Sequence, residues 1–400
     1  MKPDAVAQEA YLYGFPLLLM DAAARRATGN HGAGFNRFIH CFDLAETFLR
    51  GVTLPSKDLA RSVAWLDLRA GPVTLETLHT DSFYVMSLID AWTNVFATLG
   101  TRATGNLEHR FAIAGPNWTG PLPPNCTPIS APTNLICLVA QTALENLSQT
   151  QGLAALAERY RLEPVGTGTA RLESTCVLRD IDVLGAEEAF ARIRELMIEN
   201  PGARADSAAL SALDALRGCE TREVTTAAVA HARRLIDDDS ETERSEWSVD
   251  ANAGNYGTDY LKRARAARFN FLASAVQDVL FAQARVDARR LRLRGSKQYL
   301  LHFDPWDEPP ARAFWSLRAY DEKRGLTQPA ARATIDSRQH LARRSNRSLD
   351  IYLAHDEPPA DDARNWLACP PEDYTLALRL YWPQPAALSG VWTPPAIAAL

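Results

Sequence analysis

The segment NAGNYGTDYLKRARAARFN, residues 252–270, places hydroxyl and carboxylate groups at the start of a predicted helix. Tyr256, Asp259 and Tyr260 lie there beside backbone N–H groups that have no partner within a helix, which suits an anionic or hydroxylated ligand. Arg263 stands four residues after Asp259, where it could pair with that carboxylate on the helix surface or neutralise an anion. We therefore predict acid–base roles for Tyr256, Asp259 and Tyr260, and substrate binding by Arg263.

Two other interpretations of this segment are weaker. Gly254 and Gly257 are followed by no Lys-Ser or Lys-Thr pair and preceded by no hydrophobic strand, so the segment matches neither a P-loop nor a dinucleotide fingerprint. The basic residues spread around the helix, which argues against a grip on nucleic acid. One stripe is instead aromatic and small, and we expect it to pack in the core: Tyr256, Tyr260, Ala264, Ala267 and Phe271.

A histidine near the N-terminus offers a second source of acid–base chemistry. His40, in the string NRFIH, is close in sequence to Asp58. A neutral histidine near a carboxylate can act as a general base. A lone histidine between apolar residues is also common as a structural side chain. We retain His40 and Asp58 as catalytic candidates.

Several tryptophans stand close to an aspartate or asparagine, as in Asp90-Ala-Trp92-Thr-Asn94. Tryptophan in a β-sandwich is first of all a core residue, but such pairs could line a pocket that stacks on sugars or flat apolar ligands. The predicted substrate-binding residues are Trp65, Asp90, Trp92, Asn94, Trp118, Arg263, Trp315, Asn365, Trp366 and Arg379.

His302 and Asp304 form a His-x-Asp pattern at the end of a predicted strand, which is how jelly-roll oxygenases hold iron in a facial triad. His355 could supply a third ligand. The pattern is short, however, and Asp304 precedes a proline as a turn residue would. An iron oxygenase is therefore kept as an alternative, and our main prediction has no metal and no cofactor.

Composition limits the other classes of function. The 400 residues carry a net charge of −5, which gives no overall attraction to nucleic acid or to an anionic membrane. The six cysteines are dispersed without zinc-like spacing, which is typical of a reducing compartment. The N-terminal segment lacks the pattern of a signal peptide, and no apolar stretch is long enough to span a membrane. We expect a cytoplasmic protein, with a homo-oligomer left open.

The spacing of hydrophobic residues along the chain predicts the helices and strands that position these residues. Residues 4–27 predict a helix that Pro16 should kink, and helical character is expected again at 135–160 and over 185–285. Strands are predicted in PVTLETL, SFYVMSLIDAW and HRFAIAG, and after Arg285 in RRLRLRGSKQYLLHF, RAFWSLRAYD, RSLDIYLAHD and DYTLALRLYWP. The pattern favours an α+β protein with β-sandwich or jelly-roll parts.

Landmarks along nearly the whole chain resemble a bacterial family that pairs the domain of unknown function 1254 with the domain of unknown function 1214. They include EAYLYGFPL, AWLDLRAGPV, LIDAWTNVF and GPNWTG, then NYGTDYLKRA, FWSLRAYD, LRLYWP and GVWTPPAI. The resemblance implies two jelly-roll-like β-sandwich domains with a helical N-terminus and a helical connection. We expect domains at 1–183 and 286–400, joined by a helical segment at 184–285.

The chain departs from the family pattern just before AWLDL. The family has Asn-x-Asp-Thr-x-Tyr there, whereas SKDLARSVAWLDL retains Asp58 alone, which favours a specialised substrate. No Gly-x-Ser-x-Gly elbow or other activated nucleophile is visible. We therefore predict a metal-independent lyase, isomerase or cyclase of small-molecule metabolism, with a hydrolase possible and the substrate held between the β domains. The alternatives are a non-catalytic carbohydrate or ligand-binding protein and the iron oxygenase.

Overall fold

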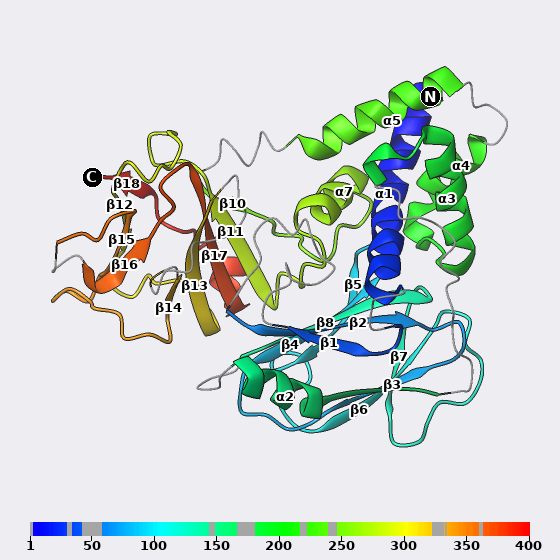
Figure 1. Cartoon of the computed structure of the whole chain (residues 1–400), viewed down its shortest axis with the longest axis horizontal. Helices are drawn as coiled ribbons and strands as arrows, with labels where there is room; N and C mark the ends of the chain where they lie inside the picture. Colours follow the sequence, from blue (N-terminus) through cyan, green and yellow to red (C-terminus); the bar gives the residue numbers. More distant parts are fainter. Residues whose placement is uncertain are drawn as a thin grey trace. The chain divides into compact units, whose positions relative to one another are not determined.

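A computed structural model of the chain forms two compact units (Figure 1). The first comprises Met1–Asp237 and Gly254–Ala273, and the second comprises Asp238–Ala253 and Ser274–Leu400. The structure describes residues 3–29, 34–41, 58–143, 149–165, 181–216, 222–238, 246–321, 332, 334–359 and 363–400.

The first unit contains a β-sandwich. One sheet has the strand order β1-β2-β8-β4-β5 and the other β7-β6-β3-β9, with antiparallel neighbours except for the parallel pair β6–β7. Their apolar inner faces form one core, to which β2, β4, β6 and β8 contribute alternate residues. The strands are β1 Phe38–Cys41, β2 Ala60–Asp67, β3 Val73–Thr77, β4 Tyr84–Asp90, β5 Val95–Gly100, β6 His109–Ala114, β7 Thr127–Ser130, β8 Leu135–Thr142 and β9 Tyr160–Pro164.

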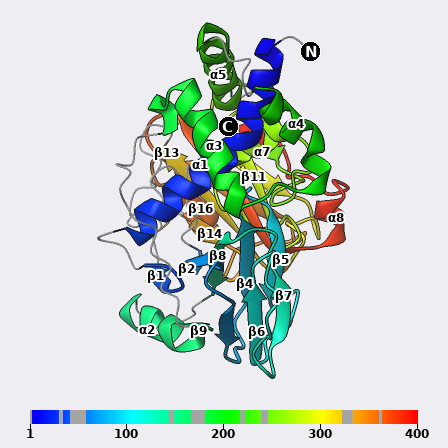
Figure 2. The ribbon, with the colours of Figure 1, turned by 90° about the vertical axis from the view of Figure 1, so that its right-hand side faces the viewer.

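Helices cover the other face of the sheet β1-β2-β8-β4-β5 (Figures 1 and 2). Helix α1 packs against four others and, with them and the sheet, encloses a second apolar core. The helices are α1 Pro3–Thr28, α3 Ala186–Glu199, α4 Ser207–Ala215, α5 Arg222–Asp237 and α7 Tyr260–Phe269, while α2 Gln149–Arg159 lies beside β9. The predicted N-terminal helix is thus confirmed, with Pro16 inside it.

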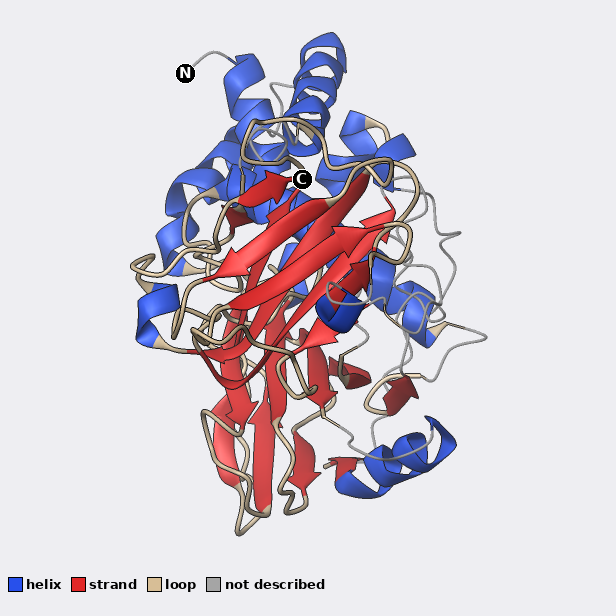
Figure 3. Ribbon diagram, turned by 90° about the vertical axis from the view of Figure 1, so that its left-hand side faces the viewer, coloured by secondary structure: helices blue, strands red, loops and turns tan. Residues whose placement is uncertain are grey.

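The second unit is also a β-sandwich; Figure 3 draws the strands of both units in red. Its sheets have the orders β10-β11-β17-β13-β14 and β16-β15-β12-β18. The strands are β10 Ser248–Val249, β11 Val279–Ala284, β12 Tyr299–Phe303, β13 Ala311–Asp321, β14 Thr334–Asp336, β15 Leu349–Ala354, β16 Trp366–Ala368, β17 Tyr374–Pro383 and β18 Ile397–Ala399, and the short helix α8 is Pro385–Leu388. As the alternation predicted, Leu376, Leu378 and Leu380 enter the core.

The predicted α+β class with two sandwiches and a helical N-terminus is confirmed. Two stretches predicted as helical contain strands. The predicted helical span 185–285 includes β10 and β11, and residues 135–142 form the strand β8. All eight residues of β8 are buried because sheet neighbours, the facing sheet and the helices enclose both of its faces. A strand buried on both faces reads as a continuous apolar run, so period alone cannot distinguish it from a buried helix.

The segment 184–285 is divided between the two units. It contributes α3, α4, α5 and α7 to the first unit and β10 and β11 to the second. None of the described helices is both long enough and apolar enough to cross a bilayer.

Candidate functional site

Helix α7 begins at the residues that the sequence singled out. Asp259 is its N-cap, and the carboxylate Oδ1 accepts a hydrogen bond of 3.0 Å from the backbone N–H of Lys262. Tyr260, Arg263, Ala264 and Ala267 then follow at helical spacing on the buried side. Arg263 therefore does not pair with Asp259 at the surface as predicted; its side chain is only 2 % exposed.

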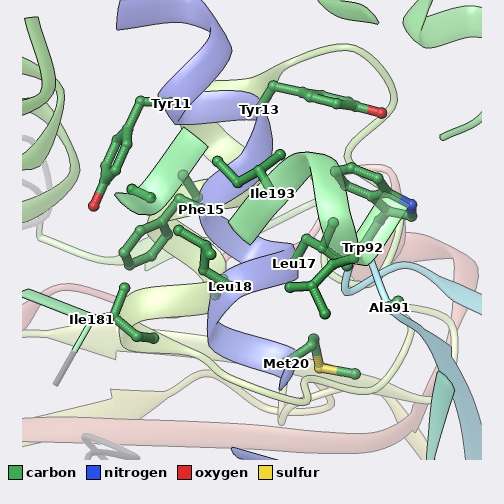
Figure 4. Packing of buried hydrophobic residues seen from close by; sticks show 14 of the residues in the cluster. Tyr11, Tyr13, Phe15, Leu17, Leu18, Met20, Ala91, Trp92, Ile181 and Ile193 are labelled. Atoms are coloured by element: carbon green, nitrogen blue, oxygen red, sulfur yellow. The ribbon is translucent and has the colours of Figure 1, made fainter. Parts of the chain in front are cut away.

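Three aromatic rings surround the Arg263 guanidinium. Its carbon lies 5.3 Å from the ring centre of Tyr13, 5.8 Å from Trp92 and 5.1 Å from Tyr260. The rings also contact one another, with Tyr13 stacked on Trp92 at 4.5 Å and edge-on to Tyr260 at 5.2 Å. Figure 4 shows Tyr13 on α1 extending to the side of the helix where Trp92 lies. This aromatic cage attracts the cation through the ring quadrupoles.

The cage leaves one edge of the guanidinium unused. Nη1 lies 3.9 Å from Oδ2 of Asp206, whose side chain is 3 % exposed. Nε and Nη2 are buried and have no hydrogen-bond partner among the described residues. These two nitrogens form the edge of arginine that grips a carboxylate with two parallel hydrogen bonds. Elsewhere in the chain that edge is filled by a carboxylate, in Arg69 with Asp67, Arg338 with Asp336 and Arg343 with Glu308.

A buried carboxyl group stands in the turn between β4 and β5. Asp90 accepts hydrogen bonds on Oδ1 from the backbone N–H groups of Trp92 (2.9 Å) and Asn94 (2.8 Å). Burial raises the pKa of Asp90 to about 6, although these hydrogen bonds and Arg263 oppose the shift. The same turn holds Thr93 at a φ of 66°, a strained conformation for a β-branched residue. Asp90 can therefore exchange a proton near neutral pH.

Tyr13 contributes an unpaired hydroxyl. Its oxygen is buried and has no hydrogen-bond partner among the described residues. Burial raises the pKa of Tyr13, and Asp206 adds to the rise, so the group is a proton donor rather than a phenolate. Gly202 leaves room for this hydroxyl, because a Cβ at position 202 would lie 2.1 Å from it. The adjacent Pro201 accepts a 3.1 Å hydrogen bond from the Trp92 indole N–H.

The structure brings together one part of the predicted set. Asp90, Trp92, Asn94, Tyr260 and Arg263 belong to the same region of the first unit through the contacts above. Tyr256 is buried in the loop before α7, where its carbonyl accepts from the N–H of Asp259, and Asp259 serves as the helix cap.

His40 lies on the opposite face of the sheet from the cage. It is paired with Ser62 across β1 and β2, and its Nδ1 lies 2.7 Å from the Ser62 hydroxyl. This is the face that meets the second sheet, where Phe38 packs on His40. Burial lowers the pKa of His40, which keeps it neutral. Asp58 is half-buried two residues before β2.

The remaining predicted residues of the first unit do not join the cage contacts. Trp65, on β2, is buried in the core between the sheet and the helices. Its indole N–H has no hydrogen-bond partner in the described chain. Trp118 is 38 % exposed in the loop between β6 and β7.

The predicted residues of the second unit have structural contacts. Trp315 is buried in the sandwich core. Asn365 bonds the backbone of Ala342 through both ends of its amide, and the indole N–H of Trp366 donates to the carbonyl of Ala354. Arg379, which is buried on β17, donates to the hydroxyl of Tyr320 at 3.2 Å.

The histidines proposed as iron ligands have other partners. His302 Nδ1 lies 2.5 Å from Asp350, and its Nε2 lies 3.4 Å from Asp304. His355 Nδ1 lies 3.0 Å from the backbone carbonyl of Cys369. In the part of the chain that the structure describes, no three histidine, cysteine or acidic side chains are grouped as metal ligands.

Sequence reasoning missed two members of the cluster. Tyr13 belongs to the landmark string EAYLYGFPL, which was its only signal. Asp206 lies in the short 3-10 helix Arg204–Asp206 and had no signal at all. The burial of Arg263 could have been inferred, because it stands three residues after Tyr260 and one before Ala264, within the apolar stripe.

Comparisons with known proteins establish the family and the fold. The family described as Protein of unknown function (DUF1254) matches residues 35–164, and Protein of unknown function (DUF1214) matches residues 278–385. The chain matches no curated protein. The crystal structure of the VPA0106 protein from Vibrio parahaemolyticus is similar, with a TM-score of 0.75, 17% identity and 100% of both chains covered. That of an uncharacterised protein from Burkholderia cenocepacia has a TM-score of 0.50 and 10% identity, covering 96% of this chain and 86% of that one.

Substitution of Gly202 tests the packing around the Tyr13 hydroxyl. Gly202→Ala should lower the free energy of unfolding by about 1–3 kcal/mol, because its methyl group overlaps that oxygen. Tyr13→Phe alone should be nearly neutral, since the hydroxyl has no partner to lose. In the double variant the overlap disappears, so urea denaturation should show a coupling of about 1 kcal/mol or more. Gly185→Ala is the control, because a Cβ there meets nothing within 4 Å. Strictly additive effects would contradict this geometry.

Asp90→Asn tests the raised pKa. Because folded Asp90 holds its proton more tightly than the unfolded chain, its contribution to stability is complete below pH 4 and is lost as pH rises through about 6. Asparagine imitates the protonated form at every pH. The variant should therefore gain stability relative to the parent between pH 4 and pH 7, by up to about 3 kcal/mol. If the difference in unfolding free energy between Asp90→Asn and the parent stayed constant from pH 4 to pH 7, the pKa of Asp90 would not be raised.

Proposed function

We propose that this chain, which belongs to the protein family that pairs DUF1254 with DUF1214, is an enzyme that binds a small organic acid through Arg263. The unused Nε and Nη2 edge of that buried guanidinium carries the proposal. A buried donor without a partner costs roughly 1–3 kcal/mol, so a ligand that fills the edge recovers this free energy on binding. A carboxylate matches the spacing of the two donors and occupies the same edge in other arginines of this chain.

The unused donors of the cation support an acid rather than a neutral ligand. Arg263 has one weak ion pair with Asp206 at 3.9 Å, which is beyond hydrogen-bond distance. A bound carboxylate would add negative charge near Asp90 and raise its pKa further. Asp90 would then take up a proton as the acid binds, and the site would hold a protonated carboxyl beside the substrate.

The reaction that fits these groups is proton transfer. Asp90 titrates near neutral pH, which suits a general acid or base, and the unpaired Tyr13 hydroxyl is a second donor. Arg263 would fix the carboxylate and stabilise the charge that develops next to it when a neighbouring C–H bond loses its proton. A lyase or an isomerase that acts on a carbon next to a carboxylate is the reaction class that we infer.

The binding step is tested with acetate, pyruvate and succinate as probes. We expect at least one of them to raise the melting temperature of the protein. Arg263→Lys keeps the positive charge but has no two-nitrogen edge, so it should lose most of this stabilisation. Arg268→Met on the same helix removes a surface arginine, paired with Asp182 and Asp237, and should keep it. Equal stabilisation of the parent and Arg263→Lys, or none by any probe, would contradict the proposal.

The catalytic step is tested by hydrogen exchange in D₂O. With acetate or succinate, if it binds, proton NMR should show replacement of hydrogen by deuterium on the carbon next to the carboxylate; with pyruvate, whose ketone carbon carries no hydrogen, the exchange should appear on the methyl carbon. Asp90→Asn should slow this exchange by roughly 100-fold or more, which is the usual contribution of a positioned acid or base. Exchange at the parental rate in this variant would exclude Asp90 from the chemistry. Binding without exchange in the parent protein would favour a non-catalytic binding protein.

A further inference from the structure

A pocket in the first unit is lined by none of the residues of the aromatic cage. It has a volume of about 280 Å³, and α1, α3 and the backbone around Asn134 and Asn200 contribute to its wall. We propose that this pocket binds an apolar α-amino acid, with the ligand carboxylate on Arg25, its ammonium group on Glu199 and its side chain against Phe35 and Leu135. The proposal does not depend on the site at Arg263.

The arginines that line the pocket are engaged by aspartates to different degrees. Asp21 accepts hydrogen bonds from Arg25 Nε at 2.9 Å and from Arg192 Nη2 at 2.8 Å, so one carboxylate is shared by two guanidinium groups. Asp67 is occupied by Arg69, which grips it with Nε and Nη2. With Glu195, which pairs with Arg192, and Glu199, the pocket is lined by three arginines and four carboxylates. A ligand anion therefore depends on a guanidinium that still has hydrogen-bond donors to offer, not on an excess of positive charge.

Arg25 is the arginine that is free to hold this anion. Its Nε is committed to Asp21, whereas its two terminal nitrogens bond to none of the described residues. The side chain is 16 % exposed and lines the pocket. A ligand carboxylate at these nitrogens would form a partly buried ion pair, which is stronger than one at an open surface.

The outer wall carries the opposite charge. Glu195 is 66 % exposed and is already held by Arg192 Nη1 at 2.7 Å. The Glu199 carboxylate accepts a 3.4 Å hydrogen bond from the Asn134 amide and interacts electrostatically with Arg69. Its carboxylate keeps most of its capacity to accept hydrogen bonds from an ammonium group. Positive and negative partners thus line one small pocket, as a zwitterion requires.

The remaining wall is apolar, and the volume limits the ligand. Phe35, Leu135 and Leu196 supply hydrocarbon surface between the charged groups. A pocket of about 280 Å³ lies at the lower end of the range for small-molecule sites, which runs to roughly 1,000 Å³. A single amino acid with an aliphatic side chain fits this volume. Its carboxylate, ammonium group and side chain match the arginine, the glutamate and the apolar residues of the wall.

The experiment is isothermal titration calorimetry of the full chain with three matched probes. L-leucine has both charges, L-leucinamide has no carboxylate, and 4-methylpentanoate has no ammonium group. We expect leucine to bind and each of the other two to bind at least tenfold more weakly. No heat with leucine, or equal affinity for leucine and 4-methylpentanoate, would overturn the proposal.

Variants assign each charge to its partner. Arg25→Met should weaken leucine at least tenfold, and Arg26→Met, which removes the exposed neighbouring arginine, should leave the affinity unchanged. Glu199→Gln should weaken leucine while leaving 4-methylpentanoate unaffected; this change on the outer wall still tests the site if Arg25→Met fails to fold. Arg263→Lys should not alter leucine binding, which separates this pocket from the proposed organic-acid site. Parental affinity in both Arg25→Met and Glu199→Gln would overturn the assignment.

Discussion

The N-terminal unit is organised around one buried cation. Arg263 extends from α7 into a space bounded by Tyr13 on α1, Trp92 in the β4–β5 turn and Asp206 beside α4. Burying a guanidinium is costly unless its charge and its donors are matched. The rings and Asp206 match the charge, but two donors remain unmatched. Arg263 thus links elements that are distant in sequence. A ligand that bonded its two unmatched donors would lower the free energy of the folded protein.

Helix α1 serves both proposed sites. Tyr13 faces the cage, whereas Asp21 and Arg25, two and three turns later, face the 280 Å³ pocket. The chain between α3 and α4 also reaches both, because Asn200 bonds the N–H of Leu135 while Pro201 accepts from Trp92. A shift of α1 would therefore disturb both sites, although each has its own charged groups. Because the two sites share no charged residue, the effect of a mutation in one can be distinguished from the effect of a mutation in the other.

Much of the fold could be predicted because local pattern and tertiary burial agree. The strands β13 and β17 alternate in residue type along the sequence, although most of their residues are buried, and the landmark strings define the order of the domains. Strand β8 could not be predicted, because residues 135–140 form a continuous apolar run without alternation. Arg263 was predicted to bind an anion, but it was placed at the surface because arginine is usually exposed. Its position within the apolar stripe indicated burial instead.

The site itself was only partly visible in the sequence. Trp92, Asp90 and Tyr260 were recognised one by one as chemically suitable, but their meeting depends on how α7 packs beside the β4–β5 turn. Asp206 comes from an irregular segment with no periodic signal. His40 shows the opposite error. It was predicted to be catalytic from its residue type alone, but the alternation of β1 places it on the face of the sheet opposite the aromatic cage.

A crystal structure grown with succinate as the only carboxylic acid tests the central claim most directly. The account predicts a carboxylate bonded to Nε and Nη2 of Arg263, with the guanidinium still enclosed by Tyr13, Trp92 and Tyr260. A structure in which the carboxylate of Asp206 or Asp90 itself fills that edge, with no ligand bound there, would contradict the account.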